Sequence, residues 1–363
     1  MLFSGLAWSL CFLLLVRAFD ATPRYVDSCI LDPILSYYRW GQAVALLNGS
    51  LLIYGGKTDQ FNSYSYTSAP NTNDLLYLSL TNPFSAASPP WILVSDSTNS
   101  SGPSLAWHTL SPSNLPNVLL FGGSPGPNSD TVIVGLADSA ELLNVASPLQ
   151  PVWTPKTTSW AGEPVRRMRH STATASSGQV FVIGGEMADG SGNAFPDHYV
   201  FNPTVLSFTL LPPDGPPDLY GHASIILSDG RLLVFGGYSP SQGTLLPLST
   251  IWVLDTSQSN LAWSVIQTST NSLPSPRIAF AATSLNDGSI LIHGGSDADI
   301  QTNFADGWIL DTSQNTMGWT QIEALSQLGA RRDHFAASQG DLVLFGFGKR
   351  KKTLSEIKFL QKN

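Results

Sequence analysis

Short apolar runs that end in paired glycines recur along the chain and dominate its pattern of hydrophobic and polar positions. Five such runs span residues 51–56, 118–123, 180–185, 232–237 and 290–295, and a degenerate sixth spans 342–348. Continuous apolar runs of this length, bounded by turn residues, are typical of strands that are buried on both faces. The chain therefore predicts one buried strand in each of six repeats of roughly 50 to 70 residues.

Other residues recur in step with these runs. Trp252 and Trp308 each open a copy of the sequence Trp-x-Leu-Asp-Thr-Ser-Gln, and Trp263 and Trp319 follow them at equal distances. Before most glycine pairs stands a turn dipeptide such as Asp229-Gly230, which is a signal for a two-residue β-hairpin. Each repeat thus reads as four antiparallel strands, and four-stranded units repeated around an axis form the blades of a propeller.

This pattern resembles the kelch-repeat family, including the propeller of galactose-oxidase-like proteins and, more loosely, fungal secreted or cell-surface kelch proteins. The resemblance covers about residues 36–350 and implies an all-β, six-bladed kelch β-propeller. Its last blade is expected to be incomplete and closed by an N-terminal strand. We expect a signal peptide over 1–18, an N-terminal segment over 19–35 with a possible closing strand at 25–31, propeller repeats over 36–348, and a basic tail over 349–363. The tail offers a possible third strand for blade six at 354–360.

Glycine and tryptophan at the repeat positions are expected to be structural. A residue without a Cβ lets the backbone turn and approach a neighbouring strand, and indole rings fill space between blades. The glycines are Gly55, Gly56, Gly122, Gly123, Gly184, Gly185, Gly236, Gly237, Gly294 and Gly295; the tryptophans are Trp252, Trp263, Trp308 and Trp319.

The N-terminus predicts secretion. Residues 6–16 form an apolar run that is too short to span a bilayer, and Val16 and Ala18 place small residues before a cleavage point. No basic residue precedes the run, and a signal anchor or a buried first strand are the alternatives. A secreted or cell-surface chain would expose Asn48 and Asn99 for glycosylation. We expect no transmembrane segment in this chain.

Charge narrows the classes of partner. Charged residues make up 12% of the chain, and its net charge is −8, which argues against a nucleic-acid ligand. Basic residues gather in the tail over 349–363, after the last repeat. That tail is either functional or the mark of an altered terminus.

Candidate binding residues lie on one face of the expected propeller. The loops between second and third strands are long, and long loops on a rigid scaffold commonly carry function. The first of them contains Phe61, Tyr64 and Tyr66, which either bind a sugar or peptide or pack against their own loop. Four arginines that begin first strands are expected near the mouth of the central channel, where they pair with an acidic ligand or with groups of their own repeat: Arg39, Arg169, Arg277 and Arg332.

Two functions follow. The first is an extracellular recognition or scaffold module that binds a protein or carbohydrate ligand on this face. The alternative is a kelch-type carbohydrate-active enzyme, either an oxidase or a sugar isomerase. The copper site of galactose-oxidase-like enzymes needs a cysteine cross-linked to tyrosine, and after cleavage Cys29 is the one cysteine left. We therefore expect no catalytic residue, no cofactor and no metal, and we expect the histidines that recur in step with the repeats to be packing residues.

Overall fold

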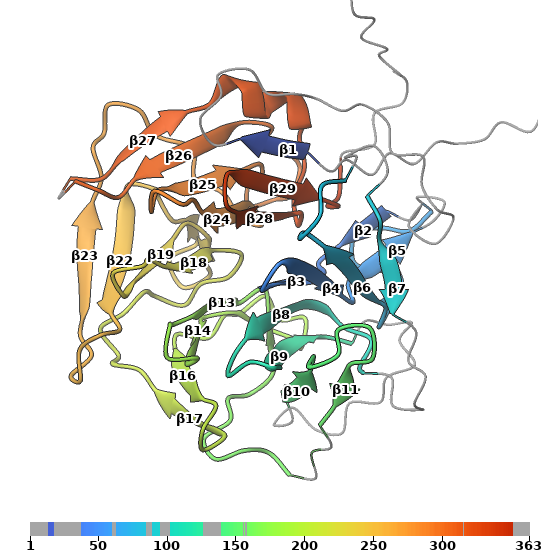
Figure 1. The fold of residues 1–363 in the computed structure, drawn as a ribbon. Coiled ribbons are helices and arrows are strands. Elements are labelled where there is room, and N and C mark those ends of the chain that lie inside the picture. The colour runs from blue at the N-terminus through green and yellow to red at the C-terminus, as the bar shows by residue number, and fades with distance from the viewer. Residues whose placement is uncertain are drawn as a thin grey trace, which may run out of the picture.

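The computed structural model describes residues 14–17, 38–59, 63–84, 89–94, 102–125, 139–154, 156, 158–314 and 316–350. Phe61, Asn99, the possible strands at 25–31 and 354–360, and most of the expected signal peptide lie outside these residues. Within them the chain is a ring of antiparallel sheets around an axis (Figure 1). The single helical element there is the short 3₁₀ helix η1 (Glu323–Leu328), and no described helix has the length and hydropathy needed to cross a membrane.

Five sheets have four strands each, in the up-and-down order expected of a propeller blade. Blade one contains β3 (Ala43–Leu47), β4 (Ser50–Tyr54), β6 (Leu75–Ser79) and β7 (Ile92–Val94). Blade two contains β8 (Ala106–Pro112), β9 (Asn117–Ser124), β10 (Ala140–Asn144) and β11 (Val152–Trp153). Blade three contains β13 (Ser171–Thr174), β14 (Val180–Ile183), β16 (Tyr199–Asn202) and β17 (Ser207–Leu210). Blade four contains β18 (Ala223–Ile226), β19 (Arg231–Phe235), β22 (Thr250–Asp255) and β23 (Trp263–Gln267). Blade five contains β24 (Ala281–Ser284), β25 (Ile290–His293), β26 (Gly307–Asp311) and β27 (Gly318–Gln321).

The expectation of six blades needs correction, because the structure has five complete blades. The last repeat forms β28 (Phe335–Gln339) and β29 (Leu342–Gly346), and β1 (Leu14–Arg17) pairs with β29 to give a three-stranded sheet. We call it the closing sheet. It lies between blade five and blade one, and apolar clusters fill both junctions. The strand that pairs there is β1, which belongs to the segment expected to be a signal peptide.

Apolar side chains between neighbouring sheets make the core. Each of the six junctions in the ring has its own buried cluster. The second strands β4, β14 and β25 are buried at every position, since each is covered on both faces. This is the reason that the second strands read as unbroken apolar runs.

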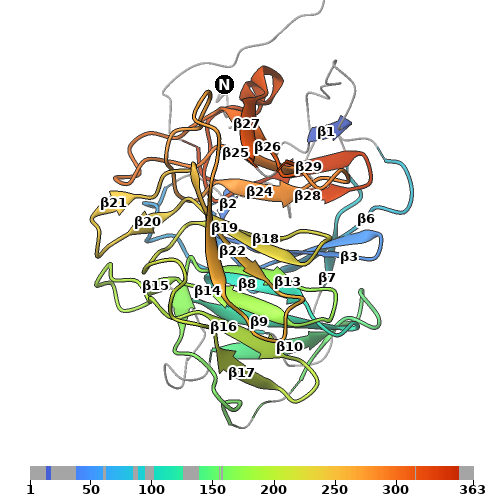
Figure 2. The same ribbon diagram turned by 90° about the vertical axis from the view of Figure 1, so that its left-hand side faces the viewer.

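The ring has two unlike faces. On one, which we call the turn face, the connections join first to second and third to fourth strands. On the other, the loop face, the second-to-third loops form small ladders, either within one loop or with the segment that precedes the first strand. These ladders are β2 (Tyr38–Trp40) with β5 (Lys57–Asp59), β12 (Arg167–Met168) with β15 (Glu186–Met187), and β20 (Tyr238–Ser239) with β21 (Thr244–Leu245). In the side view of Figure 2, β15, β20 and β21 lie on the left-hand side.

Candidate functional site on the loop face

The first long loop brings Tyr66 over the propeller axis and leaves Tyr64 outside. The Tyr64 side chain is 49% exposed. Tyr66 is half-buried, and its ring stacks on Trp40 and packs against Trp107. A hydrogen bond from Lys57 Nζ to Ala69 O anchors the loop near Tyr66. Tyr66 is therefore held in place, whereas Tyr64 is accessible to a ligand.

Six residues, one from each repeat, form an inner ring where the first strands meet the loop face. All six have φ between 52° and 66°, and they are Gly41, Trp107, Arg169, Gly221, Ala279 and Asp333. Backbone hydrogen bonds of 2.7 to 3.0 Å join them in chain order, with each amide donating to the carbonyl of the preceding member. Between Asp333 and Gly41, the Gln42 Nε2 amide donates to Asp333 O.

The large side chains of the inner ring converge with Tyr66. The Tyr66 hydroxyl donates to Asp333 Oδ2 over 2.7 Å. The Arg169 guanidinium lies 4.8 Å from the ring centre of Trp107 and 5.6 Å from that of Tyr66, and the Arg332 guanidinium lies 4.4 Å from Tyr66. We call Tyr66, Trp107, Arg169, Arg332 and Asp333 the axial cluster. No sequence motif marks Asp333, since its place depends on the folded ring.

The four arginines expected at this face do not act as one set. Arg39 and Arg277 belong to a repeated position that also holds Arg167. Each of these three donates through Nη1 to the first glycine of its own blade and pairs with an aspartate of the same blade. Their side chains are almost fully buried. These arginines therefore tie their own blades together and are not placed to meet a ligand.

Arg169 and Arg332 differ, because they follow that repeated position by two residues and by one. Arg169 Nη1 pairs with Glu186 over 2.9 Å. The same guanidinium lies 5.9 Å from the ring centre of Tyr220. Arg332 Nη1 donates to Asn303. Of the four expected arginines, these two reach the axial cluster. The two groups of arginines can be separated by their distance in sequence from the first glycine of the pair. That glycine lies 16 or 17 residues after Arg39, Arg167 and Arg277.

Burial and charge set the ionisation of the axial cluster. Burial raises the pKa of the Asp333 carboxyl, and the nearby Arg169 charge and Tyr66 hydroxyl oppose that rise. Burial and the Asp333 charge raise the pKa of Tyr66, so its phenol stays neutral and donates. Burial also raises the pKa of Glu186, against the attraction of Arg169. The cluster thus holds two guanidinium groups among aromatic rings. Their side chains are 12% and 9% exposed, and the carboxylates of Glu186 and Asp333 lie 2.9 and 3.8 Å from them.

The paired glycines connect neighbouring sheets. All ten expected glycines have positive φ, between 53° and 111°. A Cβ on Gly184 would lie 2.5 Å from Leu219 O, and one on Gly236 would lie 2.8 Å from Phe280 Cε1. Second glycines donate to the next repeat, in the pairs Gly56 with Leu105, Gly185 with Leu219, Gly237 with Arg277, Gly295 with Arg331 and Gly348 with Arg39.

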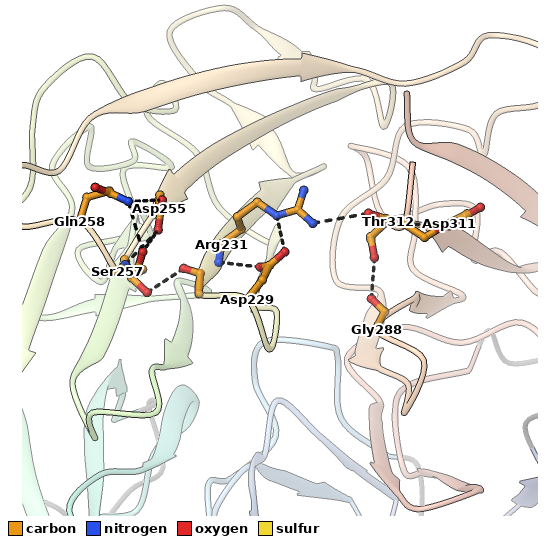
Figure 3. Close-up of polar contacts among 11 residues, drawn as sticks. Asp229, Arg231, Asp255, Ser257, Gln258, Gly288, Asp311 and Thr312 are labelled. Atoms are coloured by element: carbon orange, nitrogen blue, oxygen red, sulfur yellow. Dashed lines mark hydrogen bonds and ion pairs between the residues drawn. The ribbon is translucent and has the colours of Figure 1, made fainter. Parts of the chain in front are cut away.

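The repeated tryptophan sequences also lie in structural positions. Trp308 and Trp319 are buried between blades four and five, while Trp252 and Trp263 pack against the cluster between blades three and four. On the turn face, Asp255 accepts from Ser257, and Thr312 Oγ1 donates to Gly288 O (Figure 3). The recurring Asp-Thr-Ser thus closes turns.

Asn48 is exposed in the first-to-second turn of blade one, on the turn face.

All six histidines are buried. His170 Nε2 lies 2.9 Å from Thr109 Oγ1 and His222 Nε2 lies 2.6 Å from Ser171 Oγ, so each joins a first strand to that of the preceding blade. His293 Nδ1 lies 2.9 Å from His334 Nε2, between blade five and the closing sheet. Among the described residues no three side chains of His, Cys, Asp or Glu are grouped as metal ligands.

Comparison with known proteins agrees with this architecture. The model of the KLHDC2/KLHL20/DRC7 Kelch-repeats domain matches residues 169–361, more than half of the chain. Adagio-like protein 1 of Oryza sativa subsp. japonica is 28% identical over 265 residues, which cover 68% of this chain and 38% of that protein. Multiple epidermal growth factor-like domains protein 8 of Homo sapiens is 39% identical over 89 residues, or 23% of this chain and 3% of that protein. The matched part of the chain therefore spans little more than a third of the length of Adagio-like protein 1.

Proposed function

Because the chain belongs to the kelch-repeat β-propeller family, we propose that it is a protein-interaction module that binds a partner protein on its loop face. The observation that carries this proposal is the axial cluster with its neighbours. Trp, Tyr and Arg are the residues that most often dominate the binding energy of protein interfaces, and here Trp107, Tyr66, Tyr220, Arg169 and Arg332 gather at one point.

Electrostatics supports an acidic segment of the partner. Arg169 Nε is buried and has no hydrogen-bond partner in the described part of the chain, and Arg332 lies near the same Tyr66 ring. Guanidinium groups bind carboxylates with matched geometry. The exposed Tyr64 adds an aromatic side chain at the rim of the same face.

We also propose that the chain acts outside the cell. The apolar run over 6–16 supports this, and a glycan on Asn48 would stand on the turn face, away from the proposed binding surface. Cleavage after Ala18 would remove β1, so the secreted form would need another third strand beside β29.

Peptides selected from a random library on the immobilised chain test the proposal. We expect acidic peptides, and we expect Arg169→Lys and Tyr64→Ser each to weaken their affinity about tenfold by calorimetry. Arg231→Ala is the matched control, since Arg231 is a partly exposed cation paired with Asp229 on the turn face. If Arg231→Ala weakens peptide binding while Arg169→Lys and Tyr64→Ser do not, the peptides bind on the turn face and the proposal is contradicted. Ligands found on a glycan array alone, with no peptide, would overturn the proposed ligand class.

A further inference from the structure

The first and last repeats meet through side chains at the loop face. The bond from the Tyr66 hydroxyl to Asp333 joins residues 267 positions apart in the chain. Arg332 adds a cation 4.4 Å from the ring centre of the same tyrosine. The axial cluster therefore lies across the junction between the closing sheet and blade one.

A second group of contacts crosses the same junction. Lys349 Nζ lies 4.1 Å from the ring centre of Trp40 and 3.9 Å from Asp59 Oδ2. The Arg39 guanidinium lies 5.8 Å from the ring centre of Phe347. Two groups of charged and aromatic side chains thus link the beginning and the end of the ring.

This junction differs from the others in three respects. Here β28 and β29 come from the last repeat and blade one from the first, with β1 as the one N-terminal strand of the closing sheet, so holding the two repeats together has an entropic cost that side chains and backbone must offset. The inner ring has a backbone hydrogen bond at every other junction, but here the Gln42 side chain takes its place. The closing sheet also has three strands instead of four.

We propose that Tyr66, Arg332, Asp333 and Lys349 form a side-chain clasp that closes the propeller ring between its last and first repeats. When the clasp is released, this junction opens while blades three and four stay folded. The role goes beyond partner binding, because the clasp acts in the free chain. The loop face therefore has a second role, since the residues that meet a partner also hold the ring shut.

Hydrogen exchange measured by mass spectrometry tests the clasp in the full chain. Tyr66→Phe removes the hydroxyl that donates to Asp333 and keeps the aromatic side chain. We expect amides of β3, β4, β28 and β29 to exchange about five to ten times faster, while those of β14 and β19 keep their rates. The matched control is Tyr199→Phe, since the Tyr199 hydroxyl donates to Asp197 over 2.8 Å within blade three. It should leave the junction unchanged.

Exchange that rises equally in all blades, or that stays unchanged at the junction, would overturn the clasp. If Tyr66→Phe does not fold, Lys349→Met decides the question. Its control is Lys156→Met, because Lys156 lies 4.8 Å from the Trp160 ring in the link that leads from blade two to blade three. Faster exchange at β3 and β28 in Lys349→Met but not in the control supports the clasp, and the reverse contradicts it.

Discussion

Buried neutral histidines should make this fold sensitive to mild acid. Burial and the Arg166 charge lower the pKa of His108 to about 3, and burial and His198 lower that of His222 to about 3. Burial and the Arg331 charge lower the pKa of His293 to about 4. In the unfolded chain the pKa of each group returns to about 6.5, so the unfolded state binds more protons than the folded state between these values. Stability is therefore present above pH 6.5 and is lost as the pH falls below it.

The size of the loss follows from the displacement of the pKa. Each pH unit below 6.5 costs about 1.4 kcal/mol per histidine, so pH 5 costs about 2 kcal/mol for each of the three. Glu186 and Asp333, whose pKa values are raised, take up protons in the folded state and offset part of this loss. Asp197 and Asp306 have lowered pKa values and weaken the fold only below about pH 4. The histidines thus dominate between pH 6.5 and 5.

Urea denaturation at pH 7.5, 6.5 and 5 measures this dependence. We expect the free energy of unfolding to fall by several kcal/mol across the series. His222→Gln should reduce that fall by about 2 kcal/mol, because it removes one of the titrating groups. A free energy of unfolding that is equal at pH 7.5 and 5, or a fall of the same size in His222→Gln, would refute the reasoning.

Three other predictions concern the repeat and the N-terminus. Gly236→Ala should lower the free energy of unfolding by about 2 to 4 kcal/mol in urea denaturation, because the added Cβ meets Phe280. Gly243 has a similar φ but open space around it, so Gly243→Ala should lower that free energy by about 1 to 2 kcal/mol. Equal losses would contradict the packing argument. Arg277→Ala leaves the partly buried Asp306 unpaired and should cost about 3 to 5 kcal/mol, against less than about 1 for the partly exposed Arg231→Ala. The two should differ in denaturation midpoint, and matching midpoints would show that burial of the pair is unimportant. Secreted protein should begin near Phe19 by N-terminal sequencing, and an intact Met1 on folded protein would remove the signal-peptide prediction.

The architecture could be predicted because its main signals are local. Paired glycines, turn dipeptides and unbroken apolar second strands each have a cause within one repeat or between neighbours. The strand that pairs in the last sheet, and with it the number of blades, could not be predicted in this way. The last repeat has the same glycine-terminated strand as the others, at Leu342–Gly346, but β1, from far away in the chain, pairs beside it. Long-range pairing of this kind leaves no periodic signal.

The candidate site could be predicted only in part. The loop face and Tyr66 follow from loop length and aromatic content, and the structure places Tyr66 at the axis. Residue type and strand position alone predict the four arginines as one group. In the structure Arg39 and Arg277 bond within their own blades instead. Asp333 could not be singled out, because a lone acid beside a repeat arginine has no distinctive sequence context and its partner Tyr66 comes from the opposite end of the chain.

Photo-crosslinking from the two faces tests the central claim most directly. A benzoylphenylalanine at Tyr64 on the loop face is compared with one at Leu115 on the turn face, two sites that are 49% and 46% exposed. With a peptide selected on the wild-type chain, we predict crosslinks from position 64 and none from position 115. Crosslinks from position 115 alone would contradict the assignment of partner binding to the loop face.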